Sequence, residues 1–82
     1  MQVTKKMLES LSSLELYQKL LPLIQKLCKP YSYANFSDSF IESVAIDIIT
    51  DFKNELYSFQ EEDFTKLFEK HFCAGLEEQL KK

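Results

Sequence analysis

The chain has 82 residues, with ten lysines, no arginine and thirteen acidic residues, and its formal net charge is -3. The planar guanidinium group of arginine forms paired hydrogen bonds with guanine and with phosphate. A protein with a net negative charge also lacks the counterion release that drives most nucleic-acid binding. A nucleic acid is therefore not the expected partner.

A hydrophobic fraction of 45% and a single glycine are typical of an ordered chain. No apolar run approaches the roughly 18 residues that span a bilayer, and the N-terminal residues are too polar for a signal peptide. The two cysteines, Cys28 and Cys73, are too few for a disulfide framework and lack zinc-ligand spacing. We expect one domain over residues 1–82, with no cofactor and no membrane partner. Its expected location is the cytoplasm or, in a eukaryote, the nucleus.

Apolar residues at spacings of three and four predict helical structure over residues 4 to 28. Ser12 and Glu15 match a capping box, in which each side chain satisfies a backbone N–H of the other residue. Pro22 would remove one helical hydrogen bond, and Pro30 would close the segment. The pattern predicts a short N-terminal helix or turn, followed by a main helix that kinks near Pro22.

The second predicted helix follows Ser37, Asp38 and Ser39, all of which are good N-caps, and Ser39 with Glu42 matches another capping box. Its predicted apolar face comprises Phe40, Ile41, Val44, Ala45, Ile48, Ile49, Phe52 and Leu56.

The third predicted helix begins at a capping box of Ser58 and Glu61. Gly75 lies inside it at a cost of about 1 kcal/mol relative to alanine, which indicates a close approach of another backbone or an early helix end. With short connections and no strand pattern, the fold class is all-α: a small bundle of three main helices, with or without a short extra N-terminal helix. The predicted apolar stripe of the third helix comprises Phe64, Leu67, Phe68, His71, Phe72, Gly75, Leu76 and Leu80.

Three carboxylates, Asp47, Asp51 and Glu55, lie four residues apart on one face of the second predicted helix. A metal site would need ligands that converge from other elements as well. We therefore interpret the three as a solvated acidic ridge that can meet a basic partner.

No catalytic constellation is evident in the sequence. His71 and Cys73 are two residues apart, so on a helix they diverge by about 200° and do not converge on one atom. We expect His71 at the partly buried edge of the apolar stripe, and both cysteines as small core residues. The protein is therefore not expected to be an enzyme.

The connector between the first two segments is rich in aromatic residues. Phe36 and Ile41 have the spacing of a hydrophobic staple, so the phenylalanines are expected to close the core. Tyr31 and Tyr33 alternate with small residues, and tyrosine is enriched at interfaces. We expect these two tyrosines at the rim of the bundle or against a partner.

The leading hypothesis is a small acidic helical module that binds another protein, as an adaptor, regulator or inhibitor. Its candidate binding residues are Tyr31, Tyr33, Asp47, Asp51 and Glu55. Two alternatives stay open. One is an acidic inhibitor, encoded by a phage or virus, that occupies the nucleic-acid channel of an enzyme. The other is a weak nucleic-acid-binding module that stacks bases on its tyrosines.

A homodimer is also expected, because leucines are found nearly all the way round the first segment when it is drawn as one helix. A helix that is apolar around most of its girth needs cover on more than one side, and a second copy is the simplest cover. The leucines concerned are Leu14, Leu20, Leu21, Leu23 and Leu27.

Overall fold

The computed structural model describes residues 2–34, 37–55 and 63–81, with the backbone alone at 32–34 and 80. Within these ranges the chain forms five α-helices and one 3-10 helix and no strand, so the all-α prediction is confirmed. The elements are α1 (Lys5–Ser10), α2 (Ser13–Lys19), α3 (Leu21–Cys28), η1 (Lys29–Ala34), α4 (Asp38–Asn54) and α5 (Thr65–Leu80).

The N-terminal segment is three helices rather than one kinked helix with a short piece before it. The Ser12 side chain accepts a hydrogen bond from the Glu15 N–H at 3.2 Å, and Glu15 Oε1 accepts from the Ser12 N–H at 3.1 Å, so the predicted capping box is confirmed. Hydrogen bonds from the backbone N–H and the side chain of Ser12 to the Glu15 carboxylate hold the pKa of Glu15 below its ordinary value, because they favour the ionised form.

We expected Pro22 to kink one continuous helix, but it does not. The chain leaves helical geometry at Leu20 (φ -95°, ψ 8°), and α3 begins at the next residue with Pro22 in its first turn. A proline is tolerated there because the N–H that it lacks would have no intrahelical partner. α3 then passes directly into η1, so Pro30 lies within a 3-10 helix instead of ending all helical structure.

α4 begins two residues earlier than the capping box of Ser39 and Glu42 predicts. Ser37 is the N-cap, and its hydroxyl accepts a hydrogen bond from the Phe40 N–H at 3.2 Å. Ser39 therefore lies inside the first turn of α4. Phe40, which we assigned to the buried face, is 39% exposed.

The start of α5 is joined to the N-terminal residues of the chain. The Phe64 N–H donates to the Val3 carbonyl at 2.7 Å, and the Val3 N–H donates to Thr65 Oγ1 at 3.0 Å. Asp63 Oδ1 accepts from both the N–H and the hydroxyl of Thr65. The predicted capping box of residues 58 and 61 lies outside the described residues.

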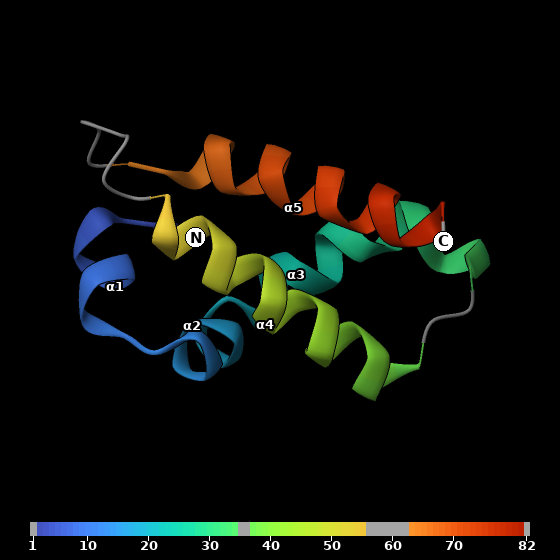
Figure 1. Cartoon of the computed structure of the whole chain (residues 1–82), viewed down its shortest axis with the longest axis horizontal. Coiled ribbons are helices and arrows are strands. Elements are labelled where there is room, and N and C mark those ends of the chain that lie inside the picture. The colour runs from blue at the N-terminus through green and yellow to red at the C-terminus, as the bar shows by residue number, and fades with distance from the viewer. Residues whose placement is uncertain (1, 35–36, 56–62, 82) are drawn as a thin grey trace.

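Figure 1 shows α4 and α5 running antiparallel beside each other, with α3 behind them and α1 and α2 at the end where α4 stops. α2 packs along α4. The Ser13 and Thr50 hydroxyls are 2.7 Å apart across this contact, and Lys53 Nζ donates to the Leu11 carbonyl at 2.5 Å. The carbonyl at the end of α1 therefore has a cationic partner from α4.

One apolar core lies between these helices. The aromatic ring of Phe52 is at its centre, in edge-on contact with Phe64 at 6.1 Å and with Phe68 at 5.7 Å between ring centroids. The completely or almost completely buried side chains of the core are Val3, Leu8, Leu16, Leu20, Ile24, Ala45, Ile49, Phe52, Phe64, Phe68, Phe72 and Leu76.

The burial of the leucines in α2 and α3 changes the interpretation of the leucine-rich segment. Of the five leucines that suggested a dimer, Leu20 and Leu23 are buried in the core and Leu21 and Leu27 are partly buried, so Leu14 alone among them is exposed. Among the described residues, the large apolar side chains that stay exposed are Leu14 (47%) and Phe40 (39%). The surface that self-association would cover is therefore smaller than the sequence suggests, and the homodimer stays a prediction.

Replacing Ile49 by aspartate should unfold the domain, because Ile49 is 0% exposed and the carboxylate would be buried without a partner. We expect loss of the cooperative thermal transition followed by circular dichroism. Ser43→Asp, on the exposed face of the same helix, should change the free energy of unfolding by no more than about 0.5 kcal/mol. Equal effects of the two substitutions would contradict the assignment of the buried face of α4.

Candidate partner-binding groove

A groove with a volume of about 710 Å³ runs between α4 and α5 on the surface of the domain. We call it the acidic groove, because five carboxylate side chains line it. α4 contributes Asp47, Asp51 and Glu55, and α5 contributes Glu77 and Glu78. The predicted acidic ridge is therefore one wall of a groove, and the opposite wall is acidic too.

The spacing of four residues places the three α4 carboxylates on one face, and the antiparallel course of α5 brings the second pair opposite them. The side chains of Asp47, Asp51 and Glu55 are all exposed. Lys81 also lines the groove, near the end of α5. Five carboxylates beside one ammonium group give the groove a strongly negative potential at neutral pH.

The floor of the acidic groove is apolar, with Val44 and Ile48 from α4 and Gly75 from α5. A Cβ atom on Gly75 would lie 2.7 Å from Cδ1 of Ile48, which is closer than two carbon atoms can approach. α5 continues through Gly75 to Leu80, so this glycine marks a close approach and not a helix end. The neighbour that requires it is the Ile48 side chain rather than another backbone.

His71 lies on the groove wall near Glu55. Its Nδ1 is 4.0 Å from Glu55 Oε2, and its ring centroid is 5.4 Å from that of Phe52. The partly buried position at the edge of the apolar stripe is confirmed. His71 thus connects the wall of the groove to the aromatic core.

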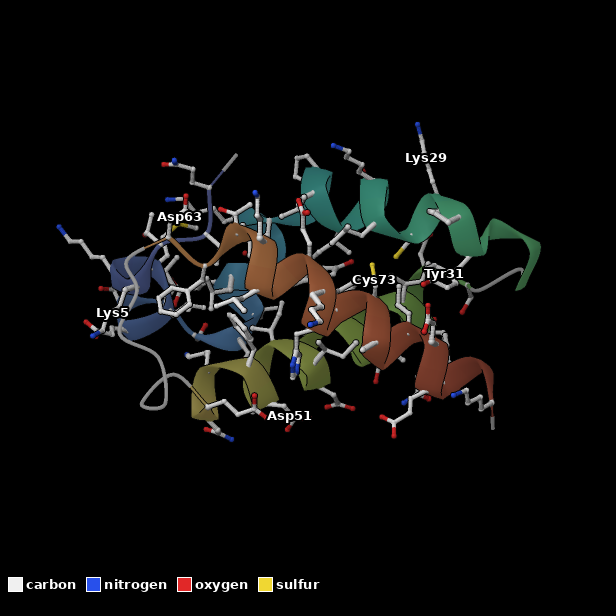
Figure 2. The ribbon with its side chains drawn as sticks, turned by 90° about the horizontal axis from the view of Figure 1, so that it is seen from above. Lys5, Lys29, Tyr31, Asp51, Asp63 and Cys73 are labelled. Atoms are coloured by element: carbon white, nitrogen blue, oxygen red, sulfur yellow. The ribbon has the colours of Figure 1, made fainter. Side chains whose placement is uncertain are left out.

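Tyr31 meets the acidic groove from the side of η1. Its ring is half-buried against the core, and its hydroxyl donates to Glu77 Oε1 at 3.0 Å. Figure 2 shows Tyr31 and Cys73 on the side of α5 that faces α3, while Asp51 lies on the side of α4. The side chain of Tyr33 and all of Phe36 lie outside the described residues.

Four of the five candidate binding residues are thus placed by the structure. Asp47, Asp51 and Glu55 lie together, and Tyr31 reaches the groove through Glu77. Glu77 and Glu78 were not among the binding residues predicted from the sequence. The sequence places both residues on the polar side of the third predicted helix. Their alignment opposite the carboxylates of α4 depends on how the two helices pack.

The described residues contain no group of three or more histidine, cysteine, aspartate or glutamate side chains that could hold a metal ion. The five groove carboxylates line an open surface, whereas a hard cation needs oxygens that converge on one point. A partner with several separated positive charges suits this arrangement better than a single ion.

None of the helices that the structure describes has both the length and the apolar character needed to cross a membrane.

Comparisons of the chain with protein-family models, with curated proteins and with solved structures found no match.

Gly75→Leu should lower the free energy of unfolding by about 1–3 kcal/mol, because the new side chain must displace Ile48 from the α4–α5 contact. Chemical denaturation followed by circular dichroism measures this difference. The matched control is Ala74→Leu, at the exposed neighbouring position, which should stay within about 0.5 kcal/mol of the parent protein. If both variants were equally stable, α4 and α5 would not approach as closely as described.

Proposed function

We propose that this protein is an acidic docking module that binds a basic, amphipathic segment of another protein in the acidic groove. It would act as an adaptor, regulator or inhibitor of that partner, and we expect it to do so in the cytoplasm. The observation that supports the proposal is the set of five carboxylates from two helices around one groove with an apolar floor.

The physical basis is the combination of charge and apolar surface. A single exposed ion pair stabilises a complex by only about 0–1 kcal/mol, but several carboxylates together steer a basic partner and fix its orientation. Val44 and Ile48 at the floor offer apolar contact that charge alone does not provide. A helix with lysine or arginine at spacings of three and four, and apolar residues between them, satisfies both requirements.

The shape of the surface favours this function over the channel inhibitor. A protein that enters the nucleic-acid channel of an enzyme must present its carboxylates on a protruding surface. Here Asp47, Asp51 and Glu55 line a recess together with Glu77 and Glu78. A recess is suited to receive a segment of the partner rather than to enter the partner.

The surroundings of Tyr31 favour a protein partner over a nucleic acid. Its ring is half-buried and its hydroxyl donates to Glu77. A base stacked on this ring would bring its phosphate close to that carboxylate, which repels it. A basic peptide would be attracted by the same carboxylate.

A designed peptide of leucine and lysine, with lysines at spacings of three and four, should bind the parent protein with a dissociation constant in the micromolar range. Asp47→Asn combined with Asp51→Asn should weaken binding by about fivefold or more, since two groove charges are lost. Isothermal titration calorimetry measures the affinity. Nuclear magnetic resonance should place the largest shift changes on the groove walls of α4 and α5.

The matched control for charge is Glu9→Gln combined with Glu42→Gln, since both side chains are exposed and do not line the acidic groove. This variant should bind within about twofold of the parent protein. Equal weakening by both double variants would show unspecific attraction and overturn the docking site. Binding of a single-stranded oligonucleotide that weakens steeply with salt would favour the nucleic-acid alternative.

We also propose that the protein forms a homodimer in which α2 contributes to the interface, because Leu14 is 47% exposed on this helix. Sedimentation equilibrium at micromolar protein should give twice the chain mass, and Leu14→Glu should give a monomer since it charges the apolar surface. A monomer mass for the parent protein would refute the dimer without affecting the groove, which lies between α4 and α5.

A further inference from the structure

Two half-buried cysteines lie on the side of α5 that faces away from the acidic groove. Cys28 is the last residue of α3 and packs against the hydrophobic core. Cys73 lies in the middle of α5, and Figure 2 shows it on the side of α5 where α3 and η1 pack. Both are free thiols in this structure.

The two helices that carry the thiols, α3 and α5, pack against each other. α3 and α5 bring Cα atoms within 8 Å of each other. Burial raises the pKa of the Cys28 thiol, and a negative charge on Cys73 raises it further. This electrostatic effect agrees with the packing of α3 against α5.

Tyr31 provides an independent indication of the same proximity. It lies in η1, three residues after Cys28, and it reaches Cys73 on α5. Burial and the charges of Glu77 and Glu69 raise the pKa of the Cys73 thiol, whereas a hydrogen bond with Tyr31 lowers that pKa. The junction of α3 and η1 is therefore in direct contact with the turn of α5 that carries Cys73.

We propose that Cys28 and Cys73 are a redox pair that closes to an intramolecular disulfide, joining the end of α3 to the middle of α5. The sequence excludes a disulfide framework, but it does not exclude one bridge between two helices that already pack together. This proposal is independent of the proposed function, because the cysteines do not line the acidic groove.

The oxidant is a small-molecule disulfide such as glutathione disulfide. One cysteine thiolate attacks it, forms a mixed disulfide and releases one glutathione thiolate. The second cysteine thiolate then attacks the bound cysteine sulfur, forms the Cys28–Cys73 bond and releases the second glutathione thiolate. The two cysteine protons end on the two glutathione thiols, so two cysteines are oxidised and one glutathione disulfide is reduced.

The raised pKa values have a consequence for the rate. Only the thiolate attacks, and a raised pKa lowers the thiolate fraction at neutral pH. Closure should therefore be slow near pH 7 and faster near pH 8.5. The bridge would close a loop of the chain that contains η1 and all of α4, so it restricts the unfolded state and stabilises the folded one.

The test is to incubate the full chain, reduced and folded, with glutathione disulfide near pH 8.5. The expected product is a single covalent chain that has lost two hydrogen atoms by intact mass, with a peptide that joins Cys28 and Cys73 after digestion. Its thermal midpoint should rise by about 5 °C or more and return after treatment with dithiothreitol.

Cys28→Ser and Cys73→Ser are the controls, with Cys28→Ala and Cys73→Ala in reserve, and circular dichroism verifies that each is folded. Each should stop at one glutathione adduct and show no rise in its thermal midpoint. A parent protein that accumulates two glutathione adducts or disulfide-linked dimers would overturn the proposal. So would a folded protein that stays reduced while the urea-unfolded chain reacts, or a bridge that lowers the thermal midpoint.

Discussion

Phe52 is almost completely buried near the end of α4 and touches the rings of Phe64, Phe68 and His71 along one face of α5. Edge-on aromatic contacts of this kind contribute about 0.5–1.5 kcal/mol each beyond the area that they bury. They join the two longest helices at the point where α4 stops and α5 starts. The antiparallel alignment of α4 and α5 follows from this contact, and with it the juxtaposition of their polar faces.

The acidic groove on the surface of the domain results from that alignment of α4 and α5. Once Phe52 and Phe68 face each other, Ile48 lies one turn earlier on α4 and Gly75 lies two turns later on α5, and the two meet at the groove floor. The absence of a side chain at Gly75 lets the helices approach, while the carboxylates diverge on both sides. A glycine that lowers helix propensity is thus compatible with a long α5, because the packing that it permits offsets the local cost.

Apolar periodicity predicted the buried face of α4 well: Val44, Ala45, Ile48, Ile49 and Phe52 are all buried. Phe40 was placed wrongly: it lies in the first turn of α4 and is 39% exposed. The division into α2 and α3 was missed because Pro22 was treated as an interruption of a helix, whereas it starts one. The second wall of the groove was not predictable from the sequence, since Glu77 and Glu78 line the groove only because α5 packs against α4.

The hydrogen bonds of Val3 with Phe64 and Thr65 join residues that are about sixty positions apart in the sequence. α1 has only six residues and one buried side chain, Leu8, so it is too short to be stable as an isolated helix. Its docking must therefore wait until the start of α5 is formed, which makes it a late event in folding. In the native ensemble the same segment should open first, so its amide protons should exchange with solvent faster than those of α4.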